Sequence, residues 1–490
     1  MIDRRSFLSA SVAAIAGTAL DSKLASGLAA AAPAAKPILQ ASGFSIVEGS
    51  RPVQLRGVNL GGWMLIEDYM IGLPWTEWKI RESFRKVVGP EGYNAFFNAY
   101  MDSYVAEPDI AFLAQCGFNL VRLPFNYRHF ESDLAPGEWI EEGFRRLESA
   151  VALCRKHGLW VLLDLHAAPG AQARDQNAGS AYGETYFWYY KNFLDRTTNL
   201  WKEIARRYSA DPAIAGYNLL CEPVTSDVAL LNKFYLNTIR AIRQVDPHHM
   251  IALDPNLWAR DIASLHDELF ADPQVIPALH HYYSETEAFA SLKTYPGTSN
   301  GVFCDRAALA HTLDGKFDLK RIHRPVMAAE FGIFRDSPQP ISVQLAITKD
   351  LVSIFEERGW SWAMWCYKDL KNMGIATVRT DTPWRRFLDD PEVTGFMAKY
   401  RELEKPFVDS VEKLMDPTEI DGDTRDQWSR EVERDFDVPA LEFILRRLAK
   451  LSPNELAAMG HSFAFDSCEI HKDQLAALAE ALAAPQPHAK

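Results

Sequence analysis

Short apolar segments alternate along the chain with longer stretches in which apolar residues recur every three or four positions. Eight of the short segments are apolar almost throughout, which is typical of strands buried on both faces of a parallel sheet. They comprise residues 54–58, 119–123, 159–164, 214–220, 250–254, 275–281, 325–329 and 361–366. Stretches between them, such as residues 108–115, 142–157 and 343–358, have the apolar spacing of helices. Eight strand–helix repeats predict an α/β fold, a (β/α)8 TIM barrel.

Further elements are predicted before and after these eight repeats. A short hairpin that turns at residues 48–50 should precede the first barrel strand. We expect the barrel to occupy residues 43–405, followed by an acidic linker and a helical C-terminal extension over residues 406–490. The extension contains an apolar helical face at residues 441–451, a capping box at Ser452 and Glu455, and a last helix over residues 473–483. The sequence leaves open whether the extension packs on the barrel, covers an edge of a cleft or mediates association.

The first 35 residues do not belong to the predicted fold. Arg4 and Arg5 precede Phe7-Leu8, a mildly apolar, alanine-rich stretch over residues 9–20 and small residues up to Pro33. This order matches a bacterial twin-arginine (Tat) export signal, with an ordinary secretory signal or a lipid anchor as the alternative. The rest of the chain has no apolar run long enough to span a bilayer. We therefore expect an exported protein of the bacterial periplasm or the extracellular space.

Composition narrows the range of partners. A formal net charge of −13 over 490 residues argues against a nucleic-acid partner, because there is no basic stripe to neutralise phosphates, and is more compatible with a neutral substrate. The six cysteines are spaced singly, without a C-x-x-C pair or a metal-like cluster with histidine, and predict buried thiols. The sequence predicts neither a cofactor nor a metal, and it does not determine the oligomeric state.

Two glutamates end apolar strand segments. Glu222 closes residues 215–222, and Glu330 closes residues 325–330. A carboxylate buried at such a position is costly unless it is paired or hydrogen-bonded, so each acid calls for an explanation. Either acid alone could simply lie beside a helix N-terminus or in a surface loop. Together they match the acid pair of a glycosidase, in which carboxyl groups about 5–5.5 Å apart carry out retaining hydrolysis.

Further polar and aromatic residues follow the predicted strands. The C-terminal ends of the strands meet at one face of a TIM barrel, where active sites lie. Residues at these ends are Asn59, Glu67, Arg122, Asn126, His166, Glu222, His280, Tyr282, Glu330, Trp365 and Lys368. The sequence therefore predicts a single site at this face.

The motifs that contain these residues resemble those of glycoside hydrolase family 5, the cellulase-like retaining β-glycosidases, over about residues 43–400. Three motifs are especially similar to the exo-β-1,3-glucanase branch of that family. They are Arg56-Gly-Val-Asn-Leu-Gly-Gly-Trp63, Leu163-Asp-Leu-His-Ala-Ala-Pro-Gly-Ala-Gln172 and Gly359-Trp-Ser-Trp-Ala-Met-Trp365. The resemblance implies a barrel enzyme that hydrolyses β-glucosidic bonds of glucans or β-glucosides through a covalent glycosyl-enzyme.

The resemblance also implies roles for the residues around the bond to be cleaved. Glu222 would be the acid/base, which must be protonated until it donates, and Glu330 would be the ionised nucleophile. Arg122 would lie beside the nucleophile and Tyr282 would donate a hydrogen bond to it, while His280 would contact substrate or the acid/base. The next residues along, His281 and Tyr283, fit the same His-x-Tyr spacing, so the sequence does not fix this register.

Three more residues would bind the sugar. His166 resembles the family's substrate-contacting histidine, with a hydrogen-bonded structural histidine as the alternative. Trp365 would be the platform under the reacting sugar, with core packing as the alternative. Glu67 resembles an acid of the exo-glucanase branch that holds hydroxyls of the terminal sugar. Here Asp68-Tyr69 follows it, where that branch usually has Pro-Trp.

Cys221 is the main departure from the family pattern. The family has asparagine directly before the acid/base, where its amide binds the sugar's 2-hydroxyl, and a thiol is a much weaker donor. Either another residue contacts the 2-position, or the substrate differs there, or the enzyme is slow. Alternatives to a hydrolase are therefore a catalytically weak glycan-binding barrel and a transglycosylase with the same site.

Overall fold

The computed structural model describes residues 37–180, 183–414, 432 and 437–483. The predicted export signal and most of the predicted acidic linker lie outside the described residues. None of the described helices combines the length and the apolar character needed to cross a membrane.

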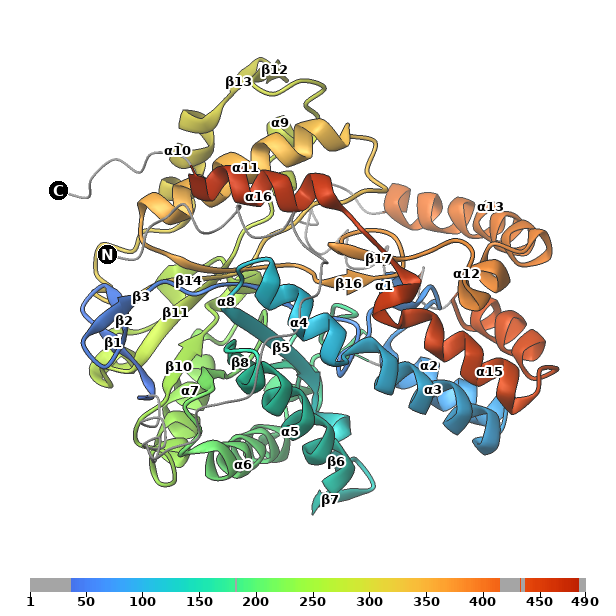
Figure 1. The fold of residues 1–490 in the computed structure, drawn as a ribbon, viewed down its shortest axis with the longest axis horizontal. Helices are drawn as coiled ribbons and strands as arrows, with labels where there is room; N and C mark the ends of the chain where they lie inside the picture. The colour runs from blue at the N-terminus through green and yellow to red at the C-terminus, as the bar shows by residue number, and fades with distance from the viewer. Residues whose placement is uncertain (1–36, 181–182, 415–431, 433–436, 484–490) are drawn as a thin grey trace, which may run out of the picture.

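Eight parallel strands close into a barrel in chain order (Figure 1). Each overlaps one of the eight predicted segments, so the (β/α)8 prediction is confirmed. The strands are β4 (Arg56–Asn59), β5 (Leu120–Asn126), β8 (Trp160–Ala167), β9 (Ile214–Asn218), β10 (Met250–Leu253), β11 (Val275–His280), β14 (Met327–Glu330) and β15 (Ser361–Met364). Their register places Asn59 opposite Arg122 and His280 opposite Glu330, which brings polar strand ends into contact.

Amphipathic helices surround the barrel. Residues predicted to be helical at 108–115, 142–157 and 343–358 form α4 (Glu107–Gln115), α5 (Glu141–Lys156) and α11 (Ile341–Glu357). The other long helices of this layer are α2 (Glu77–Val87), α3 (Pro90–Tyr104), α6 (Lys191–Tyr208), α7 (Val228–Arg243) and α10 (Arg306–Lys316). Their buried faces and the outward faces of the strands form one large apolar cluster.

A small antiparallel sheet covers the N-terminal end of the barrel. It consists of β1 (Leu39–Ser42), β2 (Ser45–Glu48) and β3 (Arg51–Val53), drawn in blue in Figure 1. The predicted hairpin corresponds to β2 and β3, whereas β1 begins before the predicted start of the domain. Leu39 and Ile46 pack in one cluster with residues of the barrel interior such as Trp160 and Met250. The opposite end of the barrel remains for the site.

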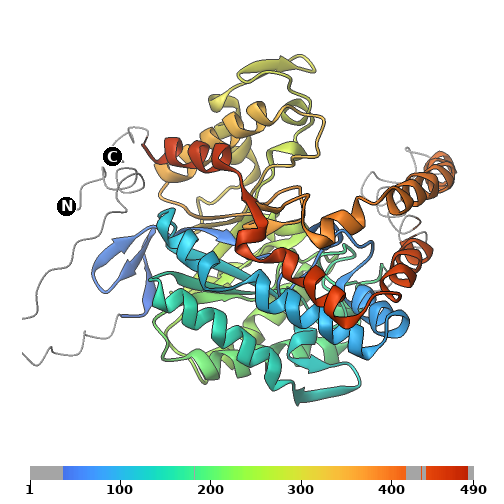
Figure 2. The same ribbon diagram turned by 45° about the vertical axis from the view of Figure 1, so that its right-hand side comes forward.

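The C-terminal extension packs on the barrel. After α12 (Pro383–Leu388) and α13 (Pro391–Leu414), the described chain resumes in a helix over residues 437–448 and continues with α15 (Pro453–Gly460) and α16 (Lys472–Ala483). The predicted capping box starts α15, since the Ser452 hydroxyl accepts the N–H of Glu455. Both views show α16 along α11, and α15 packs against α3 (Figures 1 and 2). Of the three possibilities left open by the sequence, the structure shows packing on the barrel.

A short sheet joins this extension to the end of the barrel. Its strands are β16 (Lys368–Asp369), β17 (Ala376–Val378) and β18 (Cys468–Ile470). Lys368, which we expected at the site, is fully buried at this junction. Its ammonium donates to Asp109 Oδ1 at 2.6 Å and to the carbonyls of Tyr104 and Phe463, both at 2.9 Å. The prediction for Lys368 is therefore wrong: its charge is satisfied in the core, where it joins the extension to the barrel.

Lys368→Ala should destabilise the protein strongly. The substitution leaves the buried Asp109 carboxylate without its ion-pair partner, which costs about 3–5 kcal/mol. Chemical denaturation followed by tryptophan fluorescence measures this loss, and Lys371→Ala, an exposed lysine three residues away, is the matched control. Equal stability of the two variants would contradict the anchoring role of Lys368.

Candidate active site

Glu222 and Glu330 both lie close to the same histidine, His280. Glu330 is the last residue of β14, Glu222 lies four residues after β9, and His280 ends β11. The His280 Nδ1 atom lies 2.8 Å from Glu222 Oε1 and 3.5 Å from Glu330 Oε2. The two carboxylates that the sequence singled out therefore face the same small volume at the C-terminal end of the barrel.

Glu330 is held by a buried arginine. Arg122 Nη1 lies 2.5 Å from Glu330 Oε1, and its positive charge offsets the negative charge of a carboxylate that is only 4% exposed. The guanidinium is itself fixed by three groups that the sequence reasoning did not connect with it: Asp164 Oδ1 at 3.0 Å, Asn218 Oδ1 at 3.1 Å and Asn59 Oδ1 at 2.8 Å. Glu330 consequently has one defined orientation.

The structure decides between the two His-x-Tyr registers. The Tyr282 hydroxyl donates to Glu330 Oε2 at 3.3 Å, and His280 lies between the two glutamates. Tyr283 instead donates to Gln339 and Gln344 in the core, and His281 faces the ammonium of Lys316. Only His280 and Tyr282 take part in the site.

The proton of the acid pair lies on His280 in the unliganded protein. Burial raises the pKa of Glu222, but the hydrogen bond from His280, the charges of His280 and His166, and a hydrogen bond from Asn177 outweigh it and lower this pKa to about 2. Burial lowers the pKa of His280, yet the negative charges of Glu330, Asp254 and Glu222 raise it to about 9. Protonated His280 thus stabilises the Glu222 anion in the unliganded protein, and the acid role expected of Glu222 requires a proton there when the substrate is bound.

The backbone at Glu222 is held in an unusual conformation. Its φ of 47° lies in the left-handed region, which non-glycine residues adopt at a cost and mostly at functional sites. Two side chains brace it: Asp254 Oδ2 accepts the Glu222 N–H at 2.9 Å, and the Gln172 amide donates to the carbonyls of Cys221 and His166 at 2.9 and 2.6 Å. These contacts fix the direction in which the carboxylate points.

Cys221 is enclosed by charged groups. Its Sγ atom lies 3.5 Å from Arg122 Nη2, 3.6 Å from His166 Nε2 and 3.6 Å from Glu330 Oε1. Burial, and then the charges of Glu330 and Asp164, raise the pKa of the thiol well above its usual range, and Arg122 offsets this only in part. The side chain therefore remains a neutral thiol in direct contact with the Glu330 carboxylate.

The cluster around Cys221 also contains atoms that could bind a metal. Two groups have ligand atoms close together, namely Asp164, His166 and Cys221, and Cys221, His280 and Glu330. Most of these atoms already take part in hydrogen bonds or ion pairs: His166 Nδ1 donates to Asp164 Oδ2 at 2.8 Å, and Glu330 is paired with Arg122. The arrangement is that of a hydrogen-bonded protein network around the two glutamates.

Trp365 and Glu67 lie close to the acid network, and Trp365 is 3% exposed. The Trp365 indole donates to the Tyr69 hydroxyl at 2.7 Å and stacks on the His166 ring, with centroids 5.2 Å apart. Burial, then the charges of Asp68, Glu330 and Glu222, raise the pKa of Glu67 well above its usual range. A neutral Glu67 can donate a hydrogen bond to a hydroxyl group.

Comparison with known proteins identifies the family. The model of the family described as cellulase (glycosyl hydrolase family 5) matches residues 82–371. The chain belongs to glycosyl hydrolase family 5. It is a glycoside hydrolase, and the family acts on β-glycosidic bonds.

Family 5 relatives match different shares of the chain. This chain is 32% identical to a β-xylosidase of Phanerodontia chrysosporium over 473 residues, which cover 89% of this chain and 96% of that protein. It is 26% identical to a probable glucan 1,3-β-glucosidase A of Aspergillus clavatus over 250 residues, 49% of this chain and 58% of that one. A crystal structure of a glycoside hydrolase, 19% identical, covers 65% of this chain and 90% of its own, with a TM-score of 0.50, and supports the fold.

Not every strand-end residue belongs to this family 5 site. Asn126 accepts the N–H of Arg128, at the turn after β5, and donates to Glu77 at 3.3 Å. Trp360 and Trp362, the neighbours of Trp365 in sequence, pack in the core.

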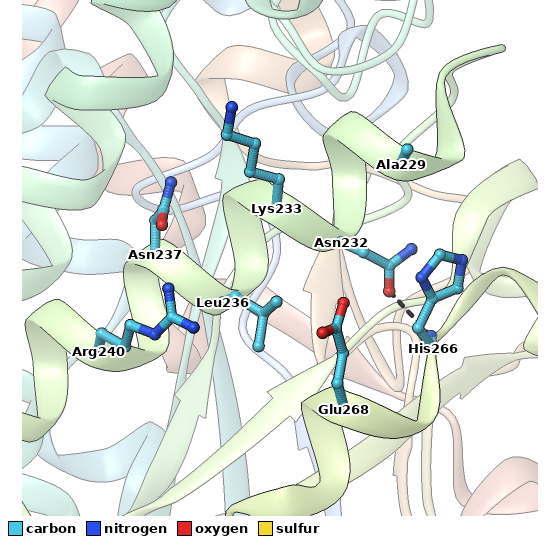
Figure 3. Close-up of a pocket in the computed structure, with 8 residues that line it drawn as sticks. All are labelled: Ala229, Asn232, Lys233, Leu236, Asn237, Arg240, His266 and Glu268. Atoms are coloured by element: carbon cyan, nitrogen blue, oxygen red, sulfur yellow. Dashed lines mark hydrogen bonds between the residues drawn. The ribbon is translucent and has the colours of Figure 1, made fainter.

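A groove elsewhere on the surface is unrelated to the acids (Figure 3). It lies between α7 and η5 (Asp267–Ala271), and the backbone N–H of His266 donates to Asn232 Oδ1 there at 2.8 Å. Its lining residues are Ala229, Asn232, Lys233, Leu236, Asn237, Arg240, His266 and Glu268. None of the candidate catalytic residues lines this groove.

The His280 proton should make stability depend on pH in a defined window. The pKa of His280 is raised from its ordinary value of about 6.5 to about 9, so protonation stabilises the folded state. That stabilisation is complete below about pH 6.5 and is lost as the pH rises through about 9. We expect the wild-type Tm to fall more over this window than the Tm of His280→Gln, measured by thermal unfolding. Parallel curves for the two proteins would contradict the assignment of the proton.

Proposed function

We propose that the protein is a retaining β-glycosidase with Glu330 as nucleophile and Glu222 as acid/base. The placement of His280 supports this proposal most directly. Because one Nδ1 atom lies 2.8 Å from Glu222 Oε1 and 3.5 Å from Glu330 Oε2, these two oxygens cannot be farther apart than the sum of the distances. Facing oxygens this close favour the roughly 5–5.5 Å carboxyl spacing of retaining enzymes over the roughly 6.5–9.5 Å spacing of inverting ones.

In the first step, Glu330 attacks the anomeric carbon while the glycosidic oxygen leaves. The leaving oxygen needs a proton, and we propose that it passes from His280 Nδ1 to Glu222 Oε1 along their 2.8 Å hydrogen bond and from Glu222 to the oxygen. Arg122 and Tyr282 hold the attacking carboxylate in line. In the second step, Glu222 removes a proton from water, which attacks the glycosyl ester and releases Glu330.

We propose β-glucosides or the β-glucosidic bonds of glucans as the substrate class. Glu67, able to donate to a sugar hydroxyl, is compatible with a pyranose beside Glu330. β-Xylosides are the second candidate, because the relative that aligns over 96% of its own length is named a β-xylosidase. A glycan-binding barrel without turnover is less compatible with the intact Glu222, Glu330 and Arg122.

A panel of aryl β-glycosides tests this proposal. We expect kcat/KM to be highest for a β-glucoside or a β-xyloside and at least about a hundredfold lower for the α-anomers, since Glu330 attacks from one face only. Sugar acceptors added to the reaction distinguish a transglycosylase, which would form longer glycosides. Binding of glycans without turnover of any member of the panel would support the binding-barrel alternative and overturn this proposal.

Cys221→Asn should lower activity. The thiol contacts three fixed groups at 3.5–3.6 Å and is 1% exposed, so a planar amide can enter only if Arg122, His166 or Glu330 moves. We expect a loss of about tenfold in kcat/KM on β-glucosides and a similar loss on 2-deoxyglucosides. A gain on β-glucosides alone would contradict this expectation and indicate a missing contact to the 2-hydroxyl.

A further inference from the structure

Five consecutive aromatic residues precede α6. They are Tyr186-Phe187-Trp188-Tyr189-Tyr190, and the first three form the short helix η3 (Tyr186–Trp188). Phe187 is fully buried and Trp188 is half-buried, whereas the exposed fractions are 40% for Tyr186, 69% for Tyr189 and 54% for Tyr190. Single exposed aromatic residues are common, but a group of them on one surface marks an interaction site. We call these three exposed residues the tyrosine patch.

Backbone bonds and ring contacts order the tyrosine patch. The N–H groups of Tyr189 and Tyr190 both donate to the carbonyl of Tyr186, at 3.1 and 3.2 Å, which folds the segment into a compact turn. The ring centroids of Tyr186 and Tyr190 lie 6.0 Å apart, and the Tyr190 ring also meets Phe193 edge-on at 6.1 Å. Rings that are already ordered can bind a ligand with little further loss of side-chain freedom.

The patch is fixed to the loop that follows β8. The N–H of Phe187 donates to the Gly170 carbonyl at 3.0 Å, and a Cβ added at Gly170 would lie 2.8 Å from that nitrogen, so this close approach requires glycine. The Trp188 indole donates to the carbonyl of Gln172 at 2.9 Å, and the Gln172 amide donates to the carbonyl of Cys221. The tyrosine patch is therefore attached to the loop that positions the acid/base.

The patch lies at the same end of the barrel as the acids. In a TIM barrel the loops that follow the strands, and the helix starts that follow these loops, lie at the C-terminal end of the strands. The patch belongs to the loop after β8 and ends directly before Lys191, the first residue of α6. The tyrosine patch and the acids therefore share the face over which a long substrate would extend.

The chemistry of the patch suits an uncharged glycan. The C–H face of a pyranose packs well on an aromatic ring, and a phenol can also exchange a hydrogen bond with a sugar hydroxyl. Among the residues that the structure describes, none bonds to the three phenol hydroxyls. Lys191, next to the patch in sequence, is paired with Asp195 at 2.5 Å and offers no free cation to an anionic ligand. A neutral glycan therefore fits the patch better than a nucleic acid or an acidic polymer.

We propose that the tyrosine patch is a second binding site, which holds a β-linked polysaccharide chain outside the cleft while another part of that chain is cleaved. The inference rests on the proposed function for the choice of glycan, a β-glucan or a β-xylan. Two sites that hold one chain raise its effective concentration at the cleft. A substrate of one sugar is too short to reach both sites and gains nothing from the patch.

Replacing Tyr186, Tyr189 and Tyr190 together by alanine should separate substrates by length. We expect KM for a soluble β-glucan or xylan to rise about tenfold with kcat unchanged, because the ring contacts to the chain are lost. For a 4-nitrophenyl β-glycoside, kcat/KM should change less than about twofold. An equal loss on the aryl glycoside would mean that the tyrosines act on the cleft itself and would overturn the proposal.

Two further variants serve as controls. Phe303→Ala removes a ring that is 59% exposed on the hairpin of β12 (Gly297–Ser299) and β13 (Val302–Cys304), and it should behave as wild type. Both views place this hairpin at the opposite end of the molecule from α6 (Figures 1 and 2). A triple variant with phenylalanine in place of the tyrosines keeps the rings and should retain most of the binding. A loss as large as in the alanine variant would overturn stacking on the rings.

Affinity electrophoresis decides the inference without turnover. In a native gel that contains mixed-linkage β-glucan or arabinoxylan, the wild type should migrate more slowly than in a plain gel, and the triple alanine variant should lose most of this retardation. Equal retardation of both proteins, or no retardation of the wild type by either polysaccharide, would overturn the second binding site. Failure of the wild type to hydrolyse any glycoside would instead refute the proposed function, and the retardation would still decide the role of the patch.

Discussion

Glu330→Gln should reduce turnover at least about 10⁴-fold, the largest loss that we expect from a single substitution. An amide cannot displace the leaving group to form a glycosyl ester. Glutamine has nearly the same shape, and its carbonyl can still accept from Arg122 Nη1, so the fold should be retained. Initial rates on an aryl β-glycoside, with a thermal unfolding curve of the same sample, measure the two effects separately.

Glu356→Gln is a matched control for this substitution. The Glu356 side chain is also buried and paired with an arginine, Arg56, at 2.7 Å, but it lies on the surrounding helix α11 and not among the acids. The folded control should retain near wild-type kcat. Activity of Glu330→Gln close to that of the control would refute the two-carboxylate mechanism. Azide gives a further check, because it should restore turnover to Glu330→Ala with inverted product configuration.

Glu222→Ala should lose the most activity on substrates whose leaving group must be protonated before it can depart. For natural glycosides, whose leaving alcohols are poor, we expect a loss of about 10²–10⁴-fold, the range of general acid catalysis. Aryl glycosides of acidic phenols need little protonation, so their first step should remain measurable and the glycosyl-enzyme should accumulate as an initial burst. Plotting log kcat/KM against the pKa of a series of phenols measures this dependence.

The slope of that plot is the informative quantity for Glu222. Loss of the acid should make the dependence on phenol pKa steeper in the variant than in the wild type. Azide should accelerate breakdown of the glycosyl-enzyme in Glu222→Ala and give a product of retained configuration, in contrast with Glu330→Ala. An equal loss on all leaving groups would mean that Glu222 acts on the structure of the site and not as the acid.

The sequence could predict the barrel because each strand is buried on both faces and leaves a nearly continuous apolar run. The same logic located the two glutamates, Arg122 and Tyr282, since side chains at the ends of parallel strands must meet at one face. It failed for Lys368, because a lysine after a strand has the same pattern whether it enters a cleft or a buried ion pair with Asp109. Only the packing of the distant C-terminal extension distinguishes these outcomes.

The residues that support the two glutamates could not be predicted from the sequence, for a related reason. Asp164 and Asn218 lie within strands, where their polarity contradicts the apolar pattern and is explained by their contacts with Arg122, His166 and Asp254. Gln172 and Asn177 belong to a loop whose path no periodicity predicts. Asp254 carried a usable signal, since it is an acid at the end of an apolar strand, as Glu222 and Glu330 are.

Which group of the acid pair holds the proton could not be predicted from the sequence, because it depends on the contact between Glu222 and His280. Sequence reasoning assigned the proton to Glu222 from its role, but the 2.8 Å contact with His280 stabilises the carboxylate anion and the imidazolium together. Because the two groups share this hydrogen bond, the proton can pass from His280 to Glu222 as Glu222 donates to the leaving oxygen. The pH dependence of stability tests the location of the proton on His280, and the series of phenol leaving groups tests proton donation by Glu222.

Trapping the covalent intermediate tests the central claim most directly. A 2-deoxy-2-fluoro-β-glycosyl fluoride of glucose or xylose should react quickly at the anomeric carbon and then hydrolyse slowly, because the fluorine at C2 destabilises both transition states while fluoride is a good leaving group. We predict a mass increase of one fluorosugar per protein, located by peptide mass spectrometry at Glu330. An active enzyme that remains unlabelled, or that carries the label at Glu222 or any other residue, would contradict the account.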